Sequence, residues 1–69
     1  MKMSRTECIK MYDIIIAHNG RPRTEDFLCF GEEKAISISR ELMLGRCAAL
    51  SREALLNAAI KARAKMLNA

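Results

Sequence analysis

The apolar residues near the start of the chain recur at intervals of three and four, which is the period of an amphipathic α-helix. Ser4 and Glu7 stand just before this stripe with the spacing of a capping box, in which each side chain bonds a backbone amide of the first turn. Asn19 and Gly20 follow the stripe, and both residue types readily take the left-handed backbone conformation that ends a helix. The pattern therefore predicts a helix over about residues 5–18. The residues of its apolar stripe are Cys8, Met11, Tyr12, Ile15 and Ile16.

A second helix is predicted near the C-terminus, over residues 53–67. This segment is rich in alanine, leucine and lysine, which are strong helix formers, and Ser51 stands where an N-cap is expected. The many alanines would allow another helix to approach closely. Its broad apolar side consists of Leu55, Leu56, Ala59, Ile60, Ala62 and Met66.

Residues 31–44, between these two helices, carry conflicting patterns. Two glutamates at the start of the segment and an apolar face behind them favour a helix. Residues 35–39, however, alternate between apolar and polar, which is typical of a strand, so residues 27–38 could instead form a β-hairpin. We favour the helix, because an isolated two-stranded hairpin is marginally stable in water. In either case the chain is expected to break again near residues 45–51.

These elements predict an all-α fold, with residues 1–69 forming a single small helical bundle of three main helices. Chains of this length bury little apolar surface, and they are commonly stabilised by disulfides, a metal or a partner subunit. Since 51% of the residues are hydrophobic, we expect apolar surface to remain for a second copy of the chain. A two-fold homodimer is the commonest such assembly, and we predict one.

The cysteine and histidine content argues against disulfides and metals as stabilising elements. Cys8, Cys29 and Cys47 are an odd number and lie far apart without a CxxC pair, and His18 is the only histidine. Zinc sites place such ligands in close pairs. We therefore expect no metal and no cofactor, and free thiols in a reducing cytosol. The apolar run at residues 14–17 is too short to span a membrane, so we expect a cytoplasmic protein without a membrane partner.

The net charge of +4 is confined to the C-terminal part of the chain. Residues 1–39 carry six basic and six acidic side chains, whereas residues 40–69 carry six basic and two acidic ones. A cationic helix of this kind either contacts nucleic-acid phosphates or is a solvated face whose cations complement the helix dipole. Aromatic residues that stack on bases are absent from this half. The candidate phosphate-contacting residues are Arg46, Arg52, Lys61, Arg63 and Lys65.

The two phenylalanines of the chain lie close together in the sequence and, with nearby large apolar residues, form a candidate protein interface. Aromatic residues and methionine are enriched at such interfaces. The same side chains would also fill the core of so small a domain, so both roles stay open. The candidate interface residues are Phe27, Leu28, Phe30, Met43 and Leu44.

No arrangement of residues in the sequence indicates catalysis. His18 has no recognisable orienting acid or nucleophile that would make it a general base, and the spacing around the three glycines does not match a helix-turn-helix. We therefore expect a small non-enzymatic regulatory protein that binds and modulates a protein partner. The alternative is a small nucleic-acid-binding regulator that uses the basic C-terminal helix. Small size and a lack of motifs are also common in regulators encoded by bacteriophages and other mobile elements.

Overall fold

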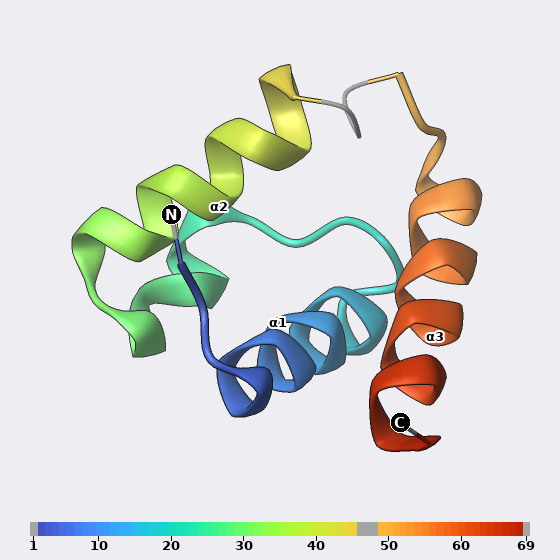
Figure 1. Cartoon of the computed structure of the whole chain (residues 1–69). Helices are drawn as coiled ribbons and strands as arrows, with labels where there is room; N and C mark the ends of the chain where they lie inside the picture. The colour runs from blue at the N-terminus through green and yellow to red at the C-terminus, as the bar shows by residue number, and fades with distance from the viewer. Residues whose placement is uncertain (1, 46–48, 69) are drawn as a thin grey trace.

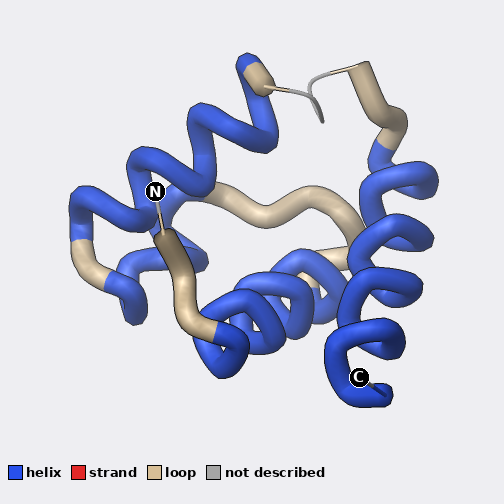
Figure 2. Tube along the Cα trace, in the orientation of Figure 1, coloured by secondary structure: helices blue, strands red, loops and turns tan. Residues whose placement is uncertain are grey.

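The computed structural model describes residues 2–45 and 49–68 of the chain. Within these ranges the chain is mostly helical and contains no β-strand (Figure 2). The all-α prediction is therefore confirmed, and the alternative β-hairpin over residues 27–38 is wrong. A 3₁₀ helix adds a fourth helical segment to the three α-helices of the described residues. The segments are α1 (Arg5–Ala17), η1 (Thr24–Phe30), α2 (Glu32–Leu44) and α3 (Arg52–Asn68).

The sequence signals that predict the helix ends are present in the structure. Ser4 Oγ accepts a hydrogen bond from the Glu7 amide at 3.1 Å, and the Ser4 amide donates to Glu7 Oε1 at 3.0 Å. At the other end of α1, Asn19 and Gly20 have φ angles of 54° and 82°, in the left-handed region that ends a helix. The Ser51 hydroxyl accepts a hydrogen bond from a backbone amide in the first turn of α3. Local signals therefore set both ends of α1 and the start of α3.

The conflicting pattern of residues 32–44 is resolved as the helix α2. Gly31, with φ 96° and ψ 157°, turns the chain between η1 and α2 in a conformation that is essentially restricted to glycine. Ala35 and Ile38 are buried on the inner side of α2, whereas Ile36 is 47% exposed. The alternation that indicated a strand therefore comes from one isoleucine on the outer side of a helix.

α3 packs against α1 in an antiparallel orientation (Figure 1). The Arg5 guanidinium donates a hydrogen bond to the Met66 carbonyl oxygen, which links the start of α1 to the end of α3. Gly20, just beyond the end of α1, lies against the backbone of Arg52, the first residue of α3. The two helices are thus in contact near both of their ends.

η1 and α2 form the second packed pair, and the two pairs meet at a small core. Phe27 of η1 has no exposed surface, and its ring stacks on that of Phe30 with the centroids 6.5 Å apart. A salt bridge of 2.6 Å between Lys34 Nζ and Glu7 Oε2 adds a link between α2 and α1. The core therefore joins all four helical segments. Its buried residues are Ile15, Phe27, Ala35, Ile38 and Ala59.

α2 and α3 lie apart, because each is held by a different partner helix (Figure 1). Within the described ranges, their backbones do not approach one another as those of the packed pairs do. Between their apolar sides and α1 lies a half-open cavity of about 350 Å³. The bundle is therefore incompletely closed where α2 and α3 would otherwise meet. Residues of all three α-helices line the cavity, including Met11, Ile38, Leu42, Leu55 and Ala62.

Gly20→Ala is expected to destabilise the fold more than Asn19→Ala. Both positions have a positive φ, where a side chain costs about 1–2 kcal/mol, but this cost is new only at Gly20, because Asn19 already carries a Cβ. At Gly20 an added Cβ would also collide with the backbone carbonyl of Arg52, so α1 and α3 would have to move apart. Urea unfolding monitored by circular dichroism measures both free energies. Equal losses in the two variants would contradict the packing of α3 on Gly20.

Acid is expected to weaken the contact between α1 and α2 through Glu7. The hydrogen bond from the Lys34 ammonium, and then that from the Ser4 amide, hold the pKa of the Glu7 carboxyl below its usual value of 4.5. The unfolded chain therefore protonates Glu7 at a higher pH than the folded chain does. The contribution of this group to stability is present above pH 4.5 and is lost as the pH falls through the lowered folded pKa.

Glu7→Gln, which keeps an acceptor for the Ser4 amide, should therefore reduce the acid sensitivity of the fold. The measurement is the free energy of unfolding in urea, at neutral pH and in the acidic range. Glu33→Gln is the control, because Glu33 is an exposed glutamate in the first turn of α2. If Glu7→Gln left the pH dependence unchanged, the contact with Lys34 would not contribute to stability.

Candidate interaction surface

The two phenylalanines of the predicted interface are directed to the interior of the chain. Phe27 is fully buried, and Phe30 is partly buried against the core, with Lys10 Nζ 5.8 Å from the centroid of its ring. Phe27 therefore has the core role that the sequence left open, and it is not part of the surface that a partner reaches. Leu28, the next residue of η1, is 50% exposed.

Met43 and Leu44, the other residues of the predicted interface, lie at the end of α2 and are strongly exposed. Met43 is 71% exposed and Leu44 is 81% exposed, which makes them the most exposed large hydrophobic side chains in the described part of the chain. Two hollows adjoin this end of α2, and Met43 lines both of them.

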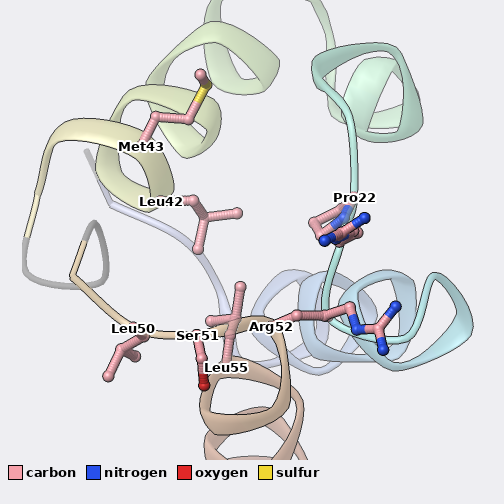
Figure 3. A pocket seen from close by; sticks show the side chains of 9 residues that line it. Pro22, Leu42, Met43, Leu50, Ser51, Arg52 and Leu55 are labelled. Atoms are coloured by element: carbon pink, nitrogen blue, oxygen red, sulfur yellow. The ribbon is translucent and has the colours of Figure 1, made fainter.

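The first hollow, of about 260 Å³, lies between the end of α2, the start of α3 and the segment that follows α1. Figure 3 shows Leu42 of α2 and Leu55 of α3 pointing toward one another across it. The Arg52 side chain extends from α3 toward the segment that carries Pro22. Leu50, just before α3, is 43% exposed and also lines this hollow. The hollow is therefore lined by both apolar and polar groups, and Arg21 and Arg52 are its charged residues.

The second hollow, also of about 260 Å³, lies on the outer side of α2. Its apolar wall is formed by Ile36, Met43 and Leu44. The hydroxyl groups of Thr24 and Ser39 also line it, but they are hydrogen-bonded to each other. Arg40 is the charged residue among those that line this hollow.

The two hollows share Met43, and we call the residues that line them the Met43 surface. It combines side chains of α2 and α3 with the segment between α1 and η1. Its apolar residues are Pro22, Ile36, Leu42, Met43, Leu44, Leu50 and Leu55, and its charged residues are Arg21, Arg40 and Arg52.

The charge of the Met43 surface is positive and uncompensated. No aspartate or glutamate lines either hollow, and Arg21, Arg40 and Arg52 form no ion pair with any described residue. Arg23, Lys34 and Arg63, in contrast, each form an ion pair, with Glu25, Glu7 and Asp13 respectively. The three arginines are therefore available to an external anion.

The residues predicted to contact phosphates do not form one surface. Arg63 forms an ion pair with Asp13 of α1 and is partly buried. Lys61 and Lys65 are exposed and lie one turn apart on α3, but Arg63 is two positions from each and points away from both. Arg52 lies at the other end of α3, on the Met43 surface. Arg46 lies outside the described residues.

The described residues contain no group of three or more histidine, cysteine, aspartate or glutamate side chains that could hold a metal. Cys8 is partly buried and Cys29 is exposed, and both are free. His18 Nε2 lies 3.5 Å from Asp26 Oδ1, a contact that the sequence did not predict, but neither residue lines the hollows described above. None of the described helices has the length and apolar composition needed to cross a membrane.

The sequence predicted Met43 and Leu44 as interface residues and Arg52 as a phosphate contact, and it predicted no site role for Ile36 or Arg40. The available signal was that Ile36 lies off the face of α2 that carries its buried residues. No known protein family matches this chain, and no curated protein or solved structure matches it either. The Met43 surface is therefore the main observation from which a function can be inferred.

Phe27→Ala is expected to cost about 3–5 kcal/mol of folding free energy, because it removes a fully buried phenylalanine ring. Leu28→Ala is the matched control: it shortens an adjacent side chain that is half exposed, and it should cost far less. Thermal and urea unfolding, followed by circular dichroism, measure the difference. Similar small losses in both variants would mean that Phe27 is not the buried residue of η1.

Proposed function

We propose that this chain is a non-enzymatic interaction protein that binds a protein partner through the Met43 surface. The observation that carries the proposal is the exposure of Met43 and Leu44, at 71% and 81%, where two hollows meet. Contiguous exposed apolar surface is typical of protein-binding sites. Methionine suits such a site, because its flexible thioether side chain adapts to different contacting groups.

The total surface area of the chain supports binding to a partner. A compact monomer of 7.8 kDa is expected to expose about 4,400 Å². This chain exposes 5044 Å². The excess of about 600 Å² shows that the chain is less compact than an average monomer of its mass. It agrees with the separation of α2 from α3, which leaves apolar surface that a partner would cover.

The nucleic-acid alternative has less support from the arrangement of the basic residues. It relies on a cationic face of α3, but the Arg63 guanidinium is paired with Asp13. The exposed basic residues on that side of α3 are then Lys61 and Lys65. The apolar side chains of the Met43 surface would also stay uncovered in a phosphate complex. A protein partner accounts for the apolar and the charged groups together.

The homodimer stays a second proposal, because another copy of the chain could also cover exposed apolar residues. Each copy has a net charge of +4, so two Met43 surfaces with their arginines would repel when they meet face to face. Sedimentation equilibrium tests this proposal directly. A monomer at all measured concentrations would exclude the dimer and leave the proposed partner binding intact.

Replacing Met43 and Leu44 together with serine is expected to weaken partner binding by about 30-fold or more, as loss of a central hot spot does. Proteins retained by the tagged chain from a lysate of its source organism would be identified by mass spectrometry. The affinity of each purified candidate would then be measured by isothermal titration calorimetry. Unchanged helicity by circular dichroism would show that the variant still folds.

The matched control replaces Ile60 and Leu67 with serine. These residues of α3 are 47% and 49% exposed and lie outside the Met43 surface. Binding should survive this change. Equal affinity of both double variants for the partner would show that the interface lies elsewhere. If every protein retained from the lysate bound the two double variants equally, that result would count against the proposal.

A further inference from the structure

We propose that the occupant of the Met43 surface is an acidic amphipathic helix of the partner protein. This inference rests on the proposed function and adds the chemistry of the bound segment. The observation behind it is the combination of exposed apolar side chains with three arginines that form no ion pair with a described residue, and with no carboxylate among the residues that line the two hollows. A complementary partner therefore carries apolar side chains flanked by aspartate or glutamate.

The order of side chains along α2 favours a helical occupant. Ile36, Arg40 and Met43 are separated by four and three positions, so they follow one another along the same side of α2. A helix packed lengthwise on this side would meet an apolar, a cationic and an apolar group in turn. Its own apolar residues would recur at three- and four-residue spacing, as in other helices that bind in grooves. An acidic residue between them would lie next to Arg40.

The arginines at the first hollow extend the same pattern beyond α2. Arg52 extends from α3 toward the segment of Pro22, as Figure 3 shows, and Arg21 lines the same hollow. Both are exposed and belong to different segments. One carboxylate bound between them would therefore connect the start of α3 to the segment between α1 and η1. Guanidinium groups bind carboxylates through two parallel hydrogen bonds, which gives orientation as well as attraction.

Other occupants match these features less well. A nucleic acid would pair with the arginines but leave Ile36, Met43 and Leu44 without apolar contacts. A second copy would bring its own positive charge to a surface that lacks acidic residues in both hollows. An acidic helix satisfies both the apolar and the charged groups.

The test uses three fluorescein-labelled helical peptides of about 20 residues, long enough to form a helix. All three carry leucine at the same i, i+3 and i+7 positions, with glutamate, glutamine or lysine at the flanking positions. Fluorescence anisotropy measures binding of each peptide to the full chain at low and at physiological salt. The glutamate peptide is expected to bind about tenfold more tightly than the glutamine peptide, and the lysine peptide more weakly than both. The preference should shrink as salt increases.

Two double variants with equal change in net charge locate the effect. Arg21→Gln with Arg52→Gln is expected to reduce the preference for glutamate over glutamine, and the remainder is contributed by Arg40. Lys61→Gln with Lys65→Gln, on the exposed side of α3 away from the hollows, should preserve that preference. An equal loss of preference in both double variants would show that the preference depends on the net charge of the chain, and it would overturn the inference.

The remaining outcomes separate this inference from the proposed function. Equal affinity for the glutamate and glutamine peptides would refute the acidic partner. If the variant Met43→Ser with Leu44→Ser then lost affinity for both peptides, the Met43 surface would still be the binding site. Peptide binding that is insensitive to Met43→Ser with Leu44→Ser would refute both. A chain that sediments as a dimer, which the same double variant dissociates, would assign the surface to a second copy. Tighter binding of duplex DNA, lost in the Arg21 and Arg52 variant, would assign it to nucleic acid.

Discussion

The burial of Phe27 is the interaction on which the rest of this structure depends. The chain is built from two packed pairs, α1 with α3 and η1 with α2, and the two pairs meet at one small core. Phe27 is the largest side chain in that core, and α1 and α2 each contribute buried residues around it. Because the pairs are joined there, α2 and α3 are attached to different partners. The open side of the bundle follows directly from this arrangement.

Short-range signals made most of the fold predictable. The capping box of Ser4 and Glu7 and the left-handed stop at Asn19 and Gly20 act within one helical turn, so the sequence displays them directly. The helix α2 was harder to predict, because the exposed Ile36 interrupts its apolar face with a strand-like alternation. The burial of the neighbouring Ala35 and Ile38, which depends on packing with distant residues, decides in favour of the helix there.

The candidate site was predictable only in part, for a related reason. Met43 and Leu44 could be recognised as large apolar residues, but residue type did not distinguish them from Phe27, which the core buries completely. The basic residues showed the same limit. Arg63 contributes to the positive charge of the C-terminal helix, yet antiparallel packing pairs it with Asp13, fifty positions away in the sequence. Arg21, Arg40 and Arg52 lie on three separate segments, so no local pattern marks them as residues of one surface.

A partner on the Met43 surface would bridge α2 and α3, whose backbones do not pack against one another within the described residues. Such a partner touches the end of α2 through Met43 and the start of α3 through Leu50 and Arg52, so it connects elements that are otherwise joined through the core and the intervening chain. A ligand that binds only the folded state stabilises that state. At the same time Met43 and Leu44 contribute little to the buried core, because most of their surface is exposed. Under the proposed function, binding would depend chiefly on Met43 and Leu44, whereas folding depends on the buried core residues.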